Sequence, residues 1–564
     1  MATNHRYVIG LDYGTNSVRC LIVRAADGVE TTAHTVVYEH GEQGILLDQR
    51  EPDLARQHPV DYLTGAVAAV RGALESARAN DPEFTPEKVA GLGVDTTGST
   101  PLPVDGKGRA LAENPDFDRD LNAMAWLWKD HTSTSEARAI TERAAAEHPE
   151  YLKKCGGVYS SEWFWAKIWH CATVSPRVTE AAASWVECAD WIPAILTGTE
   201  ANPVRGICAA GHKGMYHVSW GGFPSADFLS GLHPALGKIA SGLRGAEVAA
   251  IDHAIGGLTP EWASKMGLPA GIVVATGAFD AHLGAVGSGI APGTLVKILG
   301  TSTCDIMIAP LKPELPDVPG LCGIVPESVV PGAYGLEAGQ SAVGDIFNWW
   351  VQVIQPGGGA SHAALTAEAA KSRAGESGLL ALDWNNGNRT VLVDQRLTGL
   401  LLGQTLQTRP AEVYRALIEA TAFGARVIIE RFEEFGIRVE RVVACGGIAE
   451  KSPLVMQIYA DITGRPMQTS RSAQTCALGA AIAASVVAGL HPDVPTAQRK
   501  MTGIKDVVYQ PDPVAHAIYN RLFALYRCLH DSFGLGTSTE NIASVMKKLL
   551  VLRDEVRRGS VSVG

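Results

Sequence analysis

The sequence has no long hydrophobic run and no cluster of basic residues. Its longest apolar segment, residues 477–490, is rich in alanine and glycine and is shorter than the roughly 20 residues that cross a bilayer. We interpret it as a buried helix that packs closely through small side chains. The formal net charge is −11, and no run of lysine or arginine stands out. These features predict that neither a membrane nor a nucleic acid is a partner.

Paired cysteines and a signal peptide are also missing. The ten cysteines are scattered without a C-x-x-C pair or a regular spacing. This pattern favours reduced, mostly packed thiols over a disulfide framework. The first six residues lead directly into a strand-like run and lack the long apolar core of a signal peptide. We therefore expect a cytoplasmic protein.

Three common nucleotide or nucleophile motifs fail. The string nearest to a P-loop, residues 231–238, has the wrong spacing between glycine and lysine. No G-x-G-x-x-G follows a strand, and no G-x-S-x-G elbow is present. A nucleotide site, if there is one, must therefore use a different arrangement of glycines and hydroxyls.

The length and composition predict a folded globular protein of two or three domains, and its strand-like and helix-like segments make it an α/β protein. At 564 residues the chain is too long for one ordinary core, and its 46% hydrophobic and 19% charged residues are typical of a globular protein. Apolar spacing predicts helices over 61–78 and 408–435, the second with Pro410 in its first turn. A Ser133/Glu136 capping box predicts a helix that extends to Glu147.

An apolar strand near the N-terminus ends in a turn of small polar residues. Residues 7–9 lead to Asp12 and then to Thr15, Asn16 and Ser17. Free N–H groups and hydroxyls in such a turn suit phosphate oxygens, and Asp12 could hold a hydrated Mg²⁺. The alternative is a β-hairpin without a ligand. On this stretch alone the plain hairpin is favoured.

The second half of the chain repeats this pattern. A strand over 296–299 runs into Gly300 and Thr301, which predicts a duplicated phosphate-binding hairpin in two related lobes. A further strand over 441–444 ends at Gly446 and Gly447, and paired glycines at a strand-to-helix junction allow close approach of a nucleotide.

Three more places carry candidate substrate chemistry, each with a plainer alternative. The strand over 89–94 ends in a loop containing Gly98, which is either a ligand crevice or a threonine-rich turn. Asp280 follows the strand over 272–275 and is well placed to accept a proton from a substrate hydroxyl; it could also be a helix N-cap, and the two roles are not exclusive. Lys213 lies between glycines and either donates to a substrate or is a solvated loop lysine.

Histidines and tryptophans are given mostly structural roles. His212 and His217 have no matching cysteine or carboxylate cluster nearby in sequence, so we predict no zinc site there. The tryptophan clusters around residues 126–128 and 163–169 are expected to be mostly core, with one or two rings lining a sugar pocket.

Taken in order, these segments resemble the FGGY carbohydrate kinases of the actin/hexokinase/Hsp70 superfamily. The resemblance runs from Tyr7 to about residue 510. The motifs that carry it are GVDTTGSTP at 93–101, LWKDHT at 127–132, YSSEWFWAKI at 159–168, AGHK at 210–213, GAFDAH at 277–282, LGTSTCD at 299–305, GLEAGQSA at 335–342 and VDQRLTG at 393–399. The resemblance implies two RNase H-like lobes, over 1–288 and 289–545, with ATP and Mg²⁺ in the cleft between them.

The resemblance also implies a reaction and roles for residues. It implies that ATP phosphorylates L-ribulose at O5 in arabinose catabolism, with Asp280 as the catalytic base. The implied sugar-binding residues are Gly98, Trp128, Lys213, Asp280 and Glu337. The implied ATP- and metal-binding residues are Asp12, Thr15, Asn16, Gly300, Thr301, Gln340, Gly446 and Gly447, with Asp12 at the metal.

The identity of the sugar, the class of protein and the oligomeric state remain open at this point. The sugar could instead be D-ribulose, ribitol, D-xylulose or glycerol. A different class, an actin-like filament protein or Hsp70-like chaperone, would share the hairpins but not the sugar motifs. A homodimer is expected from the resemblance alone.

Overall fold

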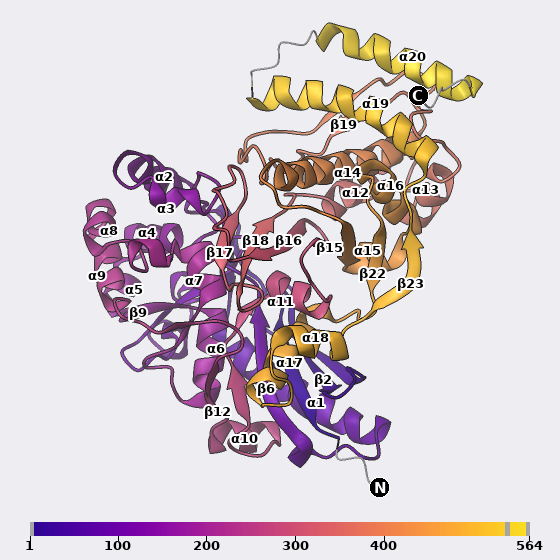
Figure 1. Cartoon of the computed structure of the whole chain (residues 1–564). Coiled ribbons are helices and arrows are strands. Elements are labelled where there is room, and N and C mark those ends of the chain that lie inside the picture. Colours follow the sequence, from indigo (N-terminus) through magenta and orange to yellow (C-terminus); the bar gives the residue numbers. More distant parts are fainter. Residues whose placement is uncertain (1–4, 536–541, 560–564) are drawn as a thin grey trace.

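The computed structural model describes residues 5–535 and 542–559, and within these ranges two seven-stranded sheets form the framework (Figure 1). The first sheet has the order β12-β13-β6-β1-β2-β3, with β14 beside the end of β6. Its strands are β1 (Tyr7–Tyr13), β2 (Ser17–Arg24), β3 (Glu30–Val37), β6 (Val89–Thr96), β12 (Ala254–Gly257), β13 (Val273–Ala275) and β14 (Ala278–Phe279).

The second sheet repeats the central pairing of the first. Its order is β17-β18-β16-β15-β21-β22-β23. β15 pairs antiparallel with β16 and parallel with β21, as β1 pairs antiparallel with β2 and parallel with β6. Its strands are β15 (Thr294–Leu299), β16 (Thr303–Pro310), β17 (Gly323–Pro326), β18 (Ala333–Ala338), β21 (Arg441–Cys445), β22 (Met467–Ser470) and β23 (Ile504–Tyr509). Both predicted hairpins are therefore present.

Helices α11 (Asp280–Gly287) and α17 (Thr475–Val487) form a layer between the two sheets (Figure 1). Alternation along each central strand produces this arrangement, because successive side chains point to opposite faces. Ile9 and Leu11 belong to an outer core, whereas Val8 packs with α11 and α17. In the second sheet Val296 joins the same central core.

The strands and helices of this layer approach one another through glycine. A Cβ on Gly10 or Gly93 would lie 1.8 or 2.0 Å from a carbonyl oxygen of α17, and one on Gly479 of α17 would lie 1.9 Å from Leu283 O of α11. The prediction of a close-packed small-residue helix over 477–490 is confirmed. Helix α17 belongs to the second half of the chain but covers the first sheet. The domain boundary between residues 288 and 289 therefore stays a prediction.

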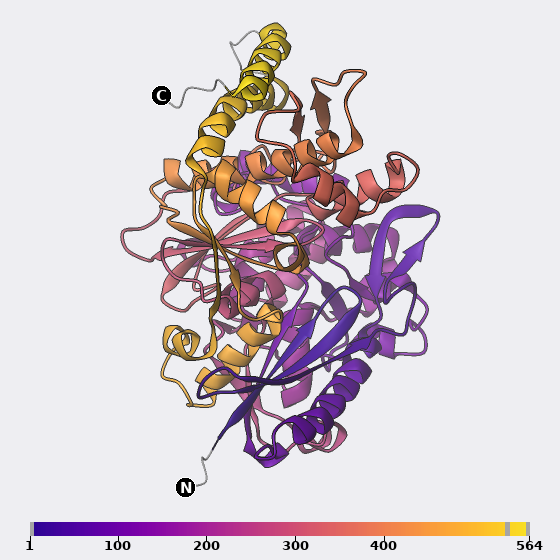
Figure 2. The same ribbon diagram turned by 90° about the vertical axis from the view of Figure 1, so that its right-hand side faces the viewer.

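Outer helices cover the remaining faces of the two sheets. The first sheet packs on α1 (Pro59–Asn80), α6 (Cys188–Thr197) and α10 (Pro260–Met266). The second packs on α14 (Pro410–Glu434), α16 (Pro453–Thr463) and α19 (Pro513–His530), and α19 and α20 (Val545–Arg558) lie at the end of the molecule remote from the first sheet (Figure 2).

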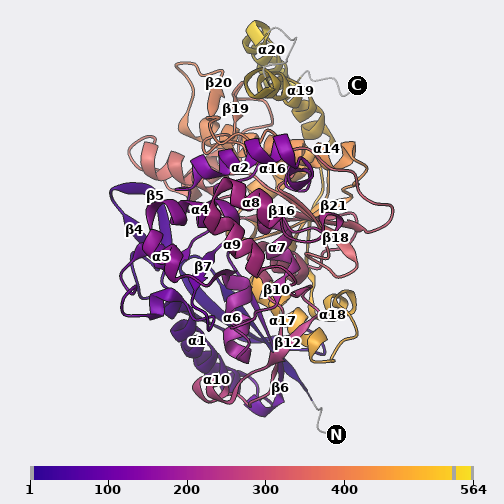
Figure 3. The ribbon, with the colours of Figure 1, turned by 90° about the vertical axis from the view of Figure 1, so that its left-hand side faces the viewer.

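A helical insertion rich in aromatic residues flanks the first lobe (Figure 3). It includes α2 (Thr134–Glu147), α4 (Phe164–Val174), α8 (Ala226–Leu232) and α9 (Pro234–Gly242). Trp126, Trp165 and Trp185 are fully buried in its core, in agreement with the expectation that most of these rings are structural.

The predicted helices over 61–78, 408–435 and 133–147 are confirmed by α1, α14 and α2. The capping box is wrong. Ser133 is the N-cap of α2, but its hydroxyl donates to Ser161 O, and Glu136 pairs with His170 instead of returning to the cap. The alternative of a solvated loop for Lys213 is also wrong, because this residue is buried in α7 (Ile207–Gly214).

Among the described residues, no helix is long and apolar enough to cross a membrane. No disulfide forms within the described ranges, which include all ten cysteines.

The glycine contacts of the central layer lead to a stability prediction. Gly93→Ala places a Cβ against the Ala480 carbonyl, so strand and helix must separate, and we expect a loss of about 1–3 kcal/mol of unfolding free energy. Gly106→Ala is the matched control, because no atom lies within 4 Å of its added Cβ. Urea denaturation of both variants checks this. Equal midpoints would contradict the close packing of α17 on the sheet.

Candidate active site

Each hairpin turn is closed by a hydrogen bond from the N–H of its glycine, across three residues in the first turn and two in the second. Gly14 N donates to Ser17 O at 2.9 Å, and Gly300 N donates to Ser302 O at 3.1 Å. Each turn follows the central strand of its sheet, β1 or β15, so the two turns occupy equivalent places in the two lobes. This is the arrangement expected of a duplicated phosphate-binding hairpin.

Neighbouring segments hold both turns. Thr15 Oγ1 accepts a hydrogen bond from Trp128 Nε1 at 3.1 Å, and Asn16 Nδ2 donates to Gln43 O at 2.6 Å. In the second turn, Thr301 O accepts from Val343 N at 2.8 Å, while the Thr301 side chain is exposed. Thr15 and Thr301 are therefore fixed by their neighbours, and the side-chain amide of Asn16 is turned toward the backbone of Gln43.

Three aspartates come together where the strands of the first sheet end. Asp12 of β1 and Asp95 of β6 are paired in register, and Ala278, two residues before Asp280, is paired with Asp95. Burial and the nearby carboxylates of Asp12 and Asp280 raise the pKa of Asp95 well above its ordinary value. Burial also raises the pKa of Asp12, against the opposing effect of Arg19, whose Nη1 lies 2.9 Å from Asp12 Oδ2.

The Asp95 carboxylate is the strongest sign of a cation at this place. Both of its oxygens are buried and, among the described residues, no donor group of another residue type reaches them, so Asp95 shares a proton with the adjacent Asp12 when no cation is bound. Buried carboxylates need a donor or a metal, and oxygen ligands of this kind suit Mg²⁺. The residues therefore fit a divalent cation held through Asp12 and Asp95. The motif at 93–101 pointed to this loop, but the register that places Asp95 beside Asp12 was not visible in the sequence.

Asp280 is the first residue of α11, and its N-cap is Phe279, so the N-cap interpretation of Asp280 is wrong. Its Oδ1 accepts a hydrogen bond from Ala281 N at 2.6 Å. Burial, with the Asp12 carboxylate adding to it, raises the pKa of Asp280 to about 7. A carboxylate with this affinity for a proton is suited to accept one from a hydroxyl near neutral pH.

A buried ion pair joins the two lobes beside these aspartates. Lys213 Nζ of α7 lies 2.8 and 3.0 Å from the two carboxylate oxygens of Glu337 on β18. Burial alone would raise the pKa of Glu337, but Lys213 and the neighbouring His212 and His282 hold it well below its ordinary value. Two residues that the sequence related only through the resemblance are thus in direct contact.

His212 and His282 flank this pair. His212 Nδ1 lies 3.3 Å and His282 Nε2 lies 3.8 Å from Glu337 Oε2. Burial lowers the pKa of His282 to about 4, so the ring is neutral at physiological pH. The potential metal-ligand atoms of His212, His282 and Glu337 lie within 4.8 Å of one another. The carboxylate of Glu337, however, is already neutralised by the ammonium of Lys213. We interpret the cluster as an ion-pair network, and His217 instead contacts Ser219.

Packing explains Gly98. A Cβ on Gly98 would lie 2.0 Å from the ring of Phe279, the residue before Asp280. The glycine therefore lets the 97–100 loop lie against the segment that carries the aspartate. Trp128 is half-buried and reaches the first hairpin through its bond to Thr15, so it stands between that loop region and the phosphate turn.

The glycines after β21 leave space beside the second hairpin. Gly446 has a φ of +93°, and a Cβ on it would lie 2.5 Å from Leu299 O at the end of β15. A Cβ on Gly447, at the start of α15 (Gly447–Lys451), would meet no atom within 4 Å. This position is open to a ligand that approaches the backbone.

Gln340 is placed beneath the second hairpin. Its Nε2 donates to Asp383 Oδ2 and Thr421 O, each at 2.7 Å, and its Oε1 accepts from Lys297 Nζ at 2.9 Å. The side chain is buried and its amide is fully engaged within the protein. We assign it a supporting role in place of the direct nucleotide contact implied by the resemblance.

Two family models cover most of the chain. The N-terminal domain of the FGGY family of carbohydrate kinases matches residues 7–287, and the C-terminal domain matches residues 295–488. The chain belongs to the FGGY family of carbohydrate kinases. The alternative of a filament protein or chaperone is therefore set aside.

Full-length relatives and solved structures agree with this assignment. The chain is 43% identical to a ribulokinase of Vibrio parahaemolyticus, over 96% of this chain and 97% of the relative. It is 41% identical to a ribulokinase of Anoxybacillus flavithermus, over 99% of both. The crystal structure of a xylulose kinase from Rhodospirillum rubrum has a TM-score of 0.76 at 24% identity, over 93% of this chain and 99% of that one. The predicted two-lobed fold is confirmed.

The raised pKa of Asp95 leads to a second prediction. With divalent cations removed by EDTA the Asp95 carboxyl is protonated and neutral, so Asp95→Asn changes the unfolding free energy by less than about 1 kcal/mol. The same variant loses Mg²⁺-dependent turnover.

Asp305→Asn is the matched control, because both Asp305 oxygens lie 2.9 Å from the buried Lys297 ammonium. Removing that partner leaves a buried cation unpaired and lowers stability by about 3 kcal/mol. Thermal melts of both variants decide. Destabilisation by Asp95→Asn in EDTA as large as that by Asp305→Asn would contradict a cation site at Asp95.

Proposed function

We propose that this carbohydrate kinase phosphorylates L-ribulose at O5, with ATP as donor, to give L-ribulose 5-phosphate in L-arabinose catabolism. Relatives named ribulokinase that align over nearly the whole chain support the substrate. The observation that carries the chemistry is the position of Asp280, a carboxylate with a raised pKa beside Asp12 and Asp95. ATP and Mg²⁺ are the cofactors of the family.

The two hairpins and the aspartates divide the work of phosphoryl transfer. Such transfer requires positioning and charge neutralisation more than strong base catalysis. The backbone N–H groups of the turns at Thr15 and Thr301 bind phosphate oxygens, and Asp12 and Asp95 hold the cation. Mg²⁺ held by these two aspartates would offset the negative charge of the phosphate groups. The nucleotide lies against Gly446 and Gly447.

The sugar occupies the space next to Asp280. Lys213 and Glu337 bind its hydroxyl and carbonyl oxygens, while Gly98 and Trp128 flank it. Asp280 accepts the proton of the attacking O5 hydroxyl, and its bond from Ala281 N keeps the carboxylate oriented at the start of α11. Because the ion pair of Lys213 and Glu337 spans the two lobes, sugar binding and lobe position are coupled.

Four other sugars or polyols are alternative phosphoryl acceptors, and the assay described below distinguishes them from L-ribulose. D-Ribulose, ribitol, D-xylulose and glycerol differ from L-ribulose in hydroxyl orientation, carbonyl or length, and these are the features that Lys213 and Glu337 contact. A cytoplasmic location and a homodimer stay predictions.

The test of this function is ADP release by the purified protein with Mg-ATP and each of these five acceptors. We expect the highest kcat/KM with L-ribulose. Equal rates with all pentuloses would broaden the substrate, and a rate independent of any sugar would overturn the proposal.

Asp280→Asn tests the base directly. The amide keeps the shape of the side chain but accepts no proton, so turnover falls by about 100-fold or more while L-ribulose affinity changes little. Asp252→Asn is the control, because Asp252 is an exposed aspartate of the same lobe. Turnover and calorimetric sugar binding are measured on both. Turnover near that of the wild type in Asp280→Asn would contradict the assignment of Asp280 as the catalytic base.

A further inference from the structure

A buried lysine of α4 connects two segments of the proposed sugar site from behind. Lys167 is fully buried, and its Nζ donates to three backbone carbonyl oxygens. These are Ser99 O at 2.8 Å, Leu127 O at 2.8 Å and Trp126 O at 3.2 Å. Three acceptors match the three protons of an ammonium group. One side chain thus ties the loop of Gly98 to the segment that carries Trp128.

Glu187 holds the same loop from a second direction. Its Oε1 accepts a hydrogen bond from Ser99 Oγ, and its Oε2 accepts from Thr100 N at 2.8 Å. Glu187 is the last residue of β9 (Ser184–Glu187) and is buried. Backbone and hydroxyl groups of the loop are thereby fixed by two side chains, Lys167 and Glu187, that both lie inside the protein.

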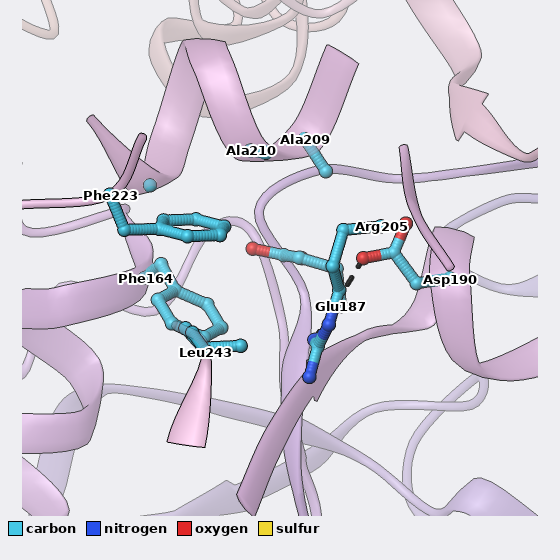
Figure 4. Close-up of a pocket in the computed structure, with 9 residues that line it drawn as sticks. Phe164, Glu187, Asp190, Arg205, Ala209, Ala210, Phe223 and Leu243 are labelled. Carbon is cyan, nitrogen blue, oxygen red and sulfur yellow. Dashed lines mark ion pairs between the residues drawn. The ribbon is translucent and has the colours of Figure 1, made fainter. Parts of the chain in front are cut away.

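The space behind the loop is not itself a substrate pocket. Glu187, Asp190 and Arg205 line a cavity of about 10 Å³ that Phe164 and Phe223 border (Figure 4). This volume is far below the several hundred Å³ of a ligand pocket. Arg205 Nη1 lies 3.9 Å from Asp190 Oδ2, and the two side chains form an ion pair. Of the charged groups around the cavity, Glu187 is the one that holds the loop.

We propose that Lys167, together with Glu187, is a positioning residue for the sugar pocket, which sets the separation of the Gly98 loop and the Trp128 segment. Hydrogen bonds are directional, so a buried amino group bonded to carbonyls of two loops limits their relative motion. A phosphoryl acceptor must be held close to its attacking geometry, and small displacements of its walls slow the reaction. The inference rests on the proposed function.

The second lobe supplies a matched comparison. Lys297 is also fully buried, and its Nζ contacts Asp305 and Gln340 Oε1, all at 2.9 Å, beneath the hairpin that we assign to phosphate binding. Lys167 and Lys297 are the same residue type at the same depth, one behind each proposed ligand.

The test compares the KM for L-ribulose and the KM for ATP in the wild type, Lys167→Met and Lys297→Met. Lys167→Met raises the sugar KM by about tenfold or more and leaves the ATP KM within about twofold, because only the sugar walls lose their shared donor. Lys297→Met raises the KM for ATP and leaves the KM for L-ribulose nearly unchanged. A general loss of structure would move both constants together in both variants, and that result would overturn the proposal.

Ser99→Ala decides the matter should Lys167→Met fail to fold. It removes only the hydroxyl that donates to Glu187, and it raises the sugar KM several-fold with the ATP KM unchanged. An unchanged sugar KM in Ser99→Ala would overturn the proposal. The wild-type control separates the two levels: inactivity of the wild type with L-ribulose refutes the proposed function, whereas an active wild type with insensitive variants refutes only the role of Lys167.

Discussion

The repulsion among Asp12, Asp95 and Asp280 is the constraint around which the site is built. Burial raises the pKa of all three, and within residues 5–535 and 542–559 only Asp12 has a cationic side chain, that of Arg19, in direct contact. Folding gathers three carboxyl groups where a cation and phosphate groups must be bound, and without a cation they hold protons more tightly than free carboxyl groups do. A site of this kind is stable only when its surroundings are rigid.

Close packing supplies that rigidity. β1 and β6 carry two of the aspartates and lie directly on α17, with glycines at 10 and 93 allowing the contact. The third aspartate begins α11, which packs on α17 through Gly479. The same two helices contact the second sheet, so the layer that fixes the aspartates also joins the lobes. Catalytic geometry and lobe arrangement therefore depend on one set of backbone contacts.

Local patterns made much of this predictable. Strand ends with small polar turns identified both hairpins, and the alanine and glycine content of residues 477–490 identified α17. The resemblance placed Asp280, Lys213 and Glu337 in one site, and Lys213 and Glu337 are indeed in contact. The surroundings of Asp95, Gln340 and Lys167 were not predictable, because their partners are distant in the sequence. Asp12, Thr421 and Ser99 lie 83, 81 and 68 residues away, in strand β1, in helix α14 and in a loop, and no local pattern brings them together.

The most direct test of the account is a crystal structure of the protein with L-ribulose, Mg²⁺ and a non-hydrolysable ATP analogue. The account predicts the sugar O5 within hydrogen-bond distance of Asp280, the metal on the side of Asp12 and Asp95, and phosphate oxygens at the turns of both hairpins. A sugar bound away from Asp280, or a metal held without either aspartate, would contradict it.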